Sequence, residues 1–139
     1  MTAKEFLRRV RGIDRRIDEA QERAERVRER LEAGRMSRLT GLPRGGVGDW
    51  TKTADRLIEL EQRINAHIRE MVRWKLAAID AIEQIEDARL REVLELYYLN
   101  GYSWTKVAET MGLSDRHVQR LHGIALCRVQ VPKEENDIE

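Results

Sequence analysis

The spacing of apolar residues near the N-terminus constrains the fold more than any other feature of the sequence. Apolar or small residues recur at steps of three and four, at Phe6, Val10, Ile13, Ile17, Ala20, Ala24, Val27 and Leu31. Such a seam runs along one side of an α-helix and is typical of helices that pack as coiled coils. The pattern predicts a helix over residues 3–33, with Thr2 and Glu5 as a capping box and Gly34 as its end.

A second stretch with helical spacing spans residues 53–86. Its apolar seam consists of Leu57, Leu60, Ile64, His67, Met71, Trp74, Ala78, Ala81 and Ile85. Between the two stretches, residues 34–52 are rich in glycine and contain Pro43, which predicts a loop. The sequence therefore predicts an antiparallel helical hairpin over residues 1–86 with this loop at its tip. Because two helices bury little apolar surface, we expect a homodimer or packing against another protein.

Residues 87–131 predict three shorter helices. The first ends near Gly101, the second begins after Ser103 and ends at Gly112, and the third begins after Ser114. Two short helices joined by a tight turn with glycine form a helix-turn-helix, a motif that places its second helix in the major groove of DNA. The acidic residues 132–139 predict a flexible tail. The expected fold is all-α: a hairpin followed by a helix-turn-helix domain.

The third predicted helix carries Arg116, Gln119 and Arg120 on its outer side, with His117 and His122 beside them. Arginine and glutamine suit paired hydrogen bonds to guanine and adenine, whereas residues at helix starts suit phosphates. The predicted DNA-binding residues are Thr105, Lys106, Ser114, Arg116, His117, Gln119 and Arg120. The alternative is a three-helix module that docks onto a protein.

Two further sets of arginines are candidate DNA contacts. Arginines recur every seven residues in the first helix, at Arg9, Arg16, Arg23 and Arg30. This stripe fits DNA phosphates or, alternatively, a solvated helix surface with pairs such as Glu19 and Arg23. In the predicted loop, possible contacts to DNA or a polymerase are Arg35, Arg38 and Arg44, and plain flexibility is the alternative.

Composition excludes several classes of protein. The net charge is +1, from 26 basic and 25 acidic residues, so total charge gives no argument for a nucleic-acid partner. Cys127 is the one cysteine, which excludes an intrachain disulfide and a cysteine-based zinc site. No apolar run approaches the roughly 20 residues of a membrane span. With no catalytic motif, we expect a cytoplasmic protein that is no enzyme and binds no cofactor, metal or membrane.

The segment RLREVLELYYLNGYSWTKVAETMGLSDRHVQRLHGIAL, residues 89–126, resembles region 4 of bacterial sigma factors, which binds the −35 promoter element. The resemblance implies that Arg116, His117, Gln119 and Arg120 read bases. Asp115 departs from the basic residue often found at its position, so the expected target differs from an ordinary −35 hexamer. Most of the chain resembles small phage and prophage regulators near the ArpU/RinA-type late transcription regulators.

The resemblance implies a phage or prophage transcription regulator that binds double-stranded DNA in the bacterial host. It implies action with host RNA polymerase on late or packaging genes, and the hairpin would mediate a homodimer or the polymerase contact. Two alternatives stay open. One is a small terminase-like subunit for DNA packaging, and the other is a sigma mimic that binds RNA polymerase without binding DNA.

Overall fold

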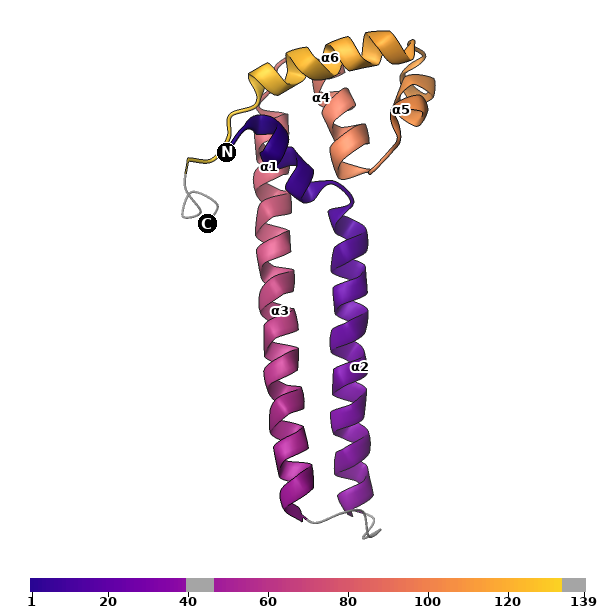
Figure 1. Cartoon of the computed structure of the whole chain (residues 1–139). Helices are drawn as coiled ribbons and strands as arrows, with labels where there is room; N and C mark the ends of the chain where they lie inside the picture. Colours follow the sequence, from indigo (N-terminus) through magenta and orange to yellow (C-terminus); the bar gives the residue numbers. More distant parts are fainter. Residues whose placement is uncertain (40–46, 134–139) are drawn as a thin grey trace. The chain divides into compact units, whose positions relative to one another are not determined.

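The computed structural model describes residues 1–39 and 47–133, and only the backbone of Val47 and Gly48. In these residues it contains helices and no β-strand, which confirms the all-α prediction (Figure 1). The elements are α1 (Ala3–Val10), α2 (Ile13–Leu39), α3 (Val47–Glu83), α4 (Ala88–Leu94), the π-helix η1 (Glu95–Leu99), α5 (Trp104–Met111) and α6 (Asp115–Arg128).

The helices form two compact units. The unit that contains the helix-turn-helix, called the HTH unit below, comprises Met1–Arg15 and Met71–Glu139. The hairpin unit comprises Arg16–Glu70. The predicted division between residues 86 and 87 differs from this grouping, because apolar side chains of α1 and of the end of α3 pack in the HTH unit.

Helix α1 begins as predicted but ends early. The Thr2 hydroxyl accepts a hydrogen bond from the Glu5 amide, and the Glu5 carboxylate accepts one from the Thr2 amide, at 3.2 and 3.0 Å. The helix stops at Val10 because Gly12 adopts φ +69°, a left-handed conformation that favours glycine. The predicted single helix over residues 3–33 is therefore wrong, and the seam is shared by two helices.

Buried apolar residues fix α1 within the HTH unit. Phe6, Leu7 and Val10 are fully buried, and the Phe6 ring packs against Trp74 of α3 with 5.9 Å between centroids. Trp74 is buried, as the seam predicted. Asp14 also forms an ion pair with Lys75 at 2.5 Å. The N-terminal residues thus belong to the same compact unit as the C-terminal helices.

The hairpin unit consists of α2 and α3 side by side and antiparallel, as predicted (Figure 1). Arg28 of α2 forms an ion pair with Glu61 of α3 at 3.1 Å. The buried residues of α2 here are Ala20, Ala24 and Val27. Small side chains at two of these three positions leave the hairpin unit with a thin apolar core.

The predicted loop over residues 34–52 is wrong at both ends. Gly34 to Leu39 continue α2, and α3 already begins at Val47, whereas residues 40–46 lie outside the described part of the chain. Gly34 does not end a helix. A Cβ atom at this position would overlap the indole ring of Trp50, so the glycine accommodates the tryptophan that packs on α2.

We expect Gly34→Ala to lower the free energy of unfolding of the hairpin unit by about 1–3 kcal/mol, since the methyl group overfills the contact with Trp50. Urea denaturation measures this loss. In a Trp50→Ala background the same change is expected to stabilise the helix slightly, because alanine has the better helix propensity. An equal loss in both backgrounds would contradict the proposed contact.

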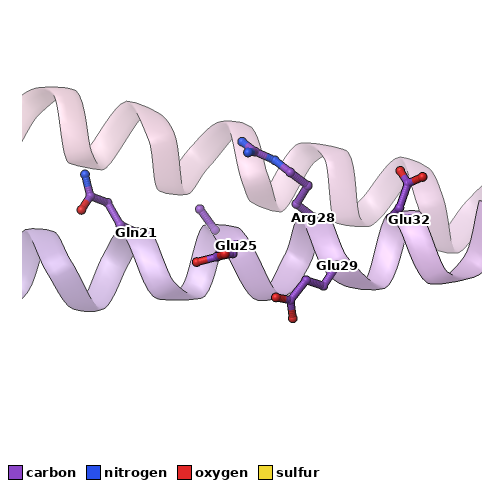
Figure 2. Close-up of a pocket in the computed structure, with 6 residues that line it drawn as sticks. Gln21, Glu25, Arg28, Glu29 and Glu32 are labelled. Carbon is purple, nitrogen blue, oxygen red and sulfur yellow. The ribbon is translucent and has the colours of Figure 1, made fainter.

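A groove of about 450 Å³ runs along α2 in the hairpin unit. Figure 2 shows its polar lining of Gln21, Glu25, Arg28, Glu29 and Glu32. Arg28 is held by Glu61, so the one cation of the groove is already paired with the neighbouring helix. The groove carries mostly negative charge, which disfavours an anionic ligand such as DNA.

Candidate nucleic-acid interface

A small apolar core positions the helix-turn-helix. Val93 of α4, Val107 and Ala108 of α5 and Val118 of α6 are buried together. Ala108 is 4% exposed, so its small side chain is part of this core. Partly buried side chains complete this core: Leu96, Tyr97, Tyr102, Trp104, Met111, Leu113 and Leu121. The contacts hold α6 against α4 and α5 and leave its other side exposed.

The turn between α5 and α6 has the predicted geometry. Gly112 adopts φ +67°, and the amide of Leu113 donates to the Ala108 carbonyl at 3.0 Å, which closes the end of α5. The Ser114 hydroxyl then accepts a hydrogen bond from the His117 amide at 3.1 Å and caps α6. Ser103 caps α5 in the same way through the Lys106 amide at 3.2 Å. These local signals were all readable in the sequence.

An aromatic cluster lies behind α6. Tyr97 of η1 stacks on Trp104 of α5 with ring centroids 3.8 Å apart, and His122 packs edge-on against Trp104 at 4.6 Å. The Tyr98 hydroxyl and His122 Nε2 form a buried hydrogen bond of 2.7 Å. The prediction that His122 lies beside the outer side of the helix is wrong. It faces the core because Tyr98 supplies a polar partner there.

Arg11 joins α1 to this cluster, a role that sequence reasoning missed. Its guanidinium group lies over the Tyr97 ring at 4.2 Å and donates a hydrogen bond to the Tyr102 carbonyl at 3.2 Å. At the other end of α4, Arg91 donates to the carbonyls of Ile85 and Glu86 at 2.5 and 3.0 Å. Both arginines bind backbone carbonyls and so hold neighbouring segments of the chain together. No local motif in the sequence distinguishes them from exposed arginines.

Burial keeps Tyr98 and His122 neutral. Desolvation, with a smaller contribution from the charge of Lys4, lowers the pKa of His122 from 6.5 to about 4. Desolvation, followed by the neighbouring Tyr97, raises the pKa of Tyr98 from 10.0 to about 12. A neutral pair is what a buried hydrogen bond inside an aromatic cluster requires.

Acid is therefore expected to destabilise the HTH unit through His122. Its pKa is lower in the folded state, so the unfolded state binds the proton first and stability is lost as pH falls from about 6.5 to about 4. The stability difference between wild type and His122→Gln should shrink by about 2–3 kcal/mol over this range. Urea denaturation of both proteins across pH measures it, and a difference that does not change with pH would contradict the buried neutral histidine.

The exposed face of α6 carries the predicted base-reading residues. Arg116, Gln119 and Arg120 are exposed and lie on one side of the helix, one turn apart. Within the described residues, no side-chain partner holds any of these three. His117 is half-buried, so it lies at the margin of this face. The arrangement presents two cations and an amide, and base contact by these residues stays a prediction.

The predicted phosphate contacts flank this face along the sequence. Thr105, Lys106 and Ser114 are exposed at or next to the starts of α5 and α6. The Lys106 ammonium lies over the Tyr102 ring at 4.0 Å, which orients it near the start of α5. Ser114 caps α6 with its oxygen while its hydroxyl hydrogen stays available for donation.

The other predicted arginines that the structure describes lie on helices. Arg35 and Arg38 are exposed on α2, and Arg44 lies outside the described residues. In the stripe of the first seam, Arg9 lies over the Trp74 ring at 4.6 Å. Arg9 thus contacts α3, and Arg16, Arg23, Arg30, Arg35 and Arg38 belong to the hairpin unit rather than to the HTH unit that contains α6.

The described residues lack the features of a metal site and of a membrane span. They contain no group of three or more His, Cys, Asp or Glu residues that fits a metal ion, and Cys127 is exposed. No described helix is long and apolar enough to cross a membrane. The exposed face of α6 therefore remains the strongest candidate site.

Comparison with known proteins agrees with this geometry. Residues 87–130 match the family model of sigma-70, region 4. Searches of curated proteins and of solved structures gave no match. The matched segment begins at the residue that caps α4 and ends just after α6, so it covers the whole helix-turn-helix. Residues 87–130 thus form a sigma-70 region 4-like domain, a DNA-binding helix-turn-helix related to that of sigma factors.

Proposed function

We propose that the chain is a transcription regulator that reads a specific DNA sequence through α6. The observation that carries the proposal is the exposed face of α6, where Arg116, Gln119 and Arg120 have no side-chain partner among the described residues. Free guanidinium groups lose no internal ion pair when they bind a ligand. In the major groove, arginine pairs with guanine O6 and N7, and glutamine pairs with adenine N6 and N7.

The capped helix starts would hold the domain on the DNA backbone. Thr105 and Lys106 in the first turn of α5, and Ser114 at the cap of α6, present donors suited to phosphate oxygens. Asp115 in the first turn of α6 adds a negative charge beside them. The recognised sequence is therefore expected to differ from an ordinary −35 hexamer.

A further part of the proposal is that the chain binds DNA together with RNA polymerase or with a second copy. The net charge of +1 gives weak non-specific attraction to DNA. In the hairpin unit, Ile58 and Leu60 of α3 are 44% and 43% exposed, which supports contact with a protein partner. The proposal includes a phage or prophage origin, action on late or packaging genes in the bacterial cytoplasm, and a role without catalysis.

Selection from a pool of 40-base-pair duplexes with a random centre tests the proposal. The full chain is used with and without bacterial RNA polymerase, and its mass in solution is measured in parallel. Enrichment of one sequence motif in either arm is expected. Capture of polymerase without any enriched motif would instead support a sigma mimic, and a ring of about eight or more subunits would support a packaging protein.

A further inference from the structure

Gly123 is an exposed glycine in the middle of α6. It lies one turn after Gln119 and Arg120, on the same face of the helix. A Cβ atom at this position would meet nothing within 4 Å, and Gly123 is not among the glycines with positive φ. Neither the backbone conformation nor packing within the chain requires a glycine here.

Gly123 lowers the stability of α6 and leaves a gap between the side chains on the surface of the helix. A glycine inside a helix lowers helix stability, and alanine at a compatible site raises the folding equilibrium constant about two- to fivefold. What glycine provides in return is space, because it lets another molecule approach the helix backbone closely. The gap continues the strip formed by Arg116, Gln119 and Arg120 along α6.

Dimensions favour DNA as the molecule that approaches. The major groove is about 12 Å wide, and a helix with its side chains is about 10–12 Å across, so the fit is tight. We propose that Gly123 is a close-approach position that lets the third turn of α6 lie against DNA in the major groove, beyond the turns that carry Arg116 and Arg120. This inference rests on the proposed function and extends the DNA-binding face by one turn.

Graded substitution tests the proposal in the full chain. The probe is a duplex that wild type selects from the random pool, with the dissociation constant measured by fluorescence anisotropy. Gly123→Ala is expected to stabilise the fold about two- to fivefold while weakening DNA binding. Gly123→Gln, which is longer but uncharged, is expected to weaken binding about tenfold or more with the fold intact by urea denaturation.

Ala66→Gln is the matched control, because Ala66 is an exposed residue within α3 of the hairpin unit. It is expected to leave DNA affinity unchanged. Wild-type affinity in Gly123→Gln, together with weakened binding in Arg116→Ala, would overturn the role of Gly123 and leave the proposed function standing. If the wild-type protein enriches no sequence from the pool, both the role of Gly123 and the proposed function are overturned. A loss of polymerase capture in Gly123→Gln at unchanged DNA affinity would assign the gap to a protein partner and overturn the proposal.

Discussion

Phe6→Ala is expected to lower the free energy of unfolding of the HTH unit by about 3–5 kcal/mol, although Phe6 lies over 80 residues from the helix-turn-helix in sequence. The side chain is fully buried and packs on Trp74, so its removal leaves a cavity that the short helix α1 cannot fill. Urea denaturation of the full chain, followed by tryptophan fluorescence, measures the loss.

Two variants bracket this result. Phe6→Leu keeps most of the buried apolar volume and is expected to cost about 1–1.5 kcal/mol. Lys4→Ala changes an exposed residue of the same helix and should stay within about 0.5 kcal/mol of wild type. A loss below about 1 kcal/mol for Phe6→Ala would show that α1 is not part of the core of the HTH unit.

Arg116→Ala and Arg120→Ala are each expected to weaken binding to the selected duplex by about 1–3 kcal/mol and to relax the preference for particular bases. The physical reason is that each guanidinium group is exposed and without a side-chain partner in the described structure, ready for two hydrogen bonds to one guanine. Selection repeated with each variant shows which base pair loses its preference, and anisotropy gives the affinity.

Two further variants separate base contacts from charge. Lys106→Ala, if Lys106 binds a phosphate, should weaken binding to all sequences alike and reduce the slope of affinity against salt by about one. Arg63→Ala removes an exposed cation of the hairpin unit and is expected to leave the sequence preference unchanged. The proposed base contacts would be ruled out if the double variant with Arg116→Ala and Arg120→Ala folds and binds the duplex with wild-type affinity.

Local signals in the sequence predicted much of the HTH unit. The caps at Thr2, Ser103 and Ser114 and the left-handed Gly112 depend on neighbouring residues alone, and all four are confirmed. The exposed positions of the α6 face also follow from helical periodicity, because its buried side is marked by Val118 and Ala125. The caps, the turn and the exposed face of α6 depend on neighbouring residues, so the sequence alone predicts them.

The errors arise where distant contacts decide. The apolar seam continues across Gly12, so the spacing does not reveal the break at this glycine or the separate packing of α1 on Trp74. Gly34 resembles a helix end in sequence, but Trp50 sixteen residues later requires a glycine within the helix. The sequence predicts His122 beside the outer side of α6, whereas Tyr98 offers a buried partner from η1. Each of these contacts joins residues that no short motif connects.

Methylation interference on the selected duplex tests most directly the central claim that α6 reads bases in the major groove. Dimethyl sulfate methylates guanine N7 in the major groove and adenine N3 in the minor groove. If Arg116 and Arg120 bind guanine edges, N7 methylation at one or two guanines should block binding of the full chain. Interference only at adenine N3, or at no base, would contradict this account of the site.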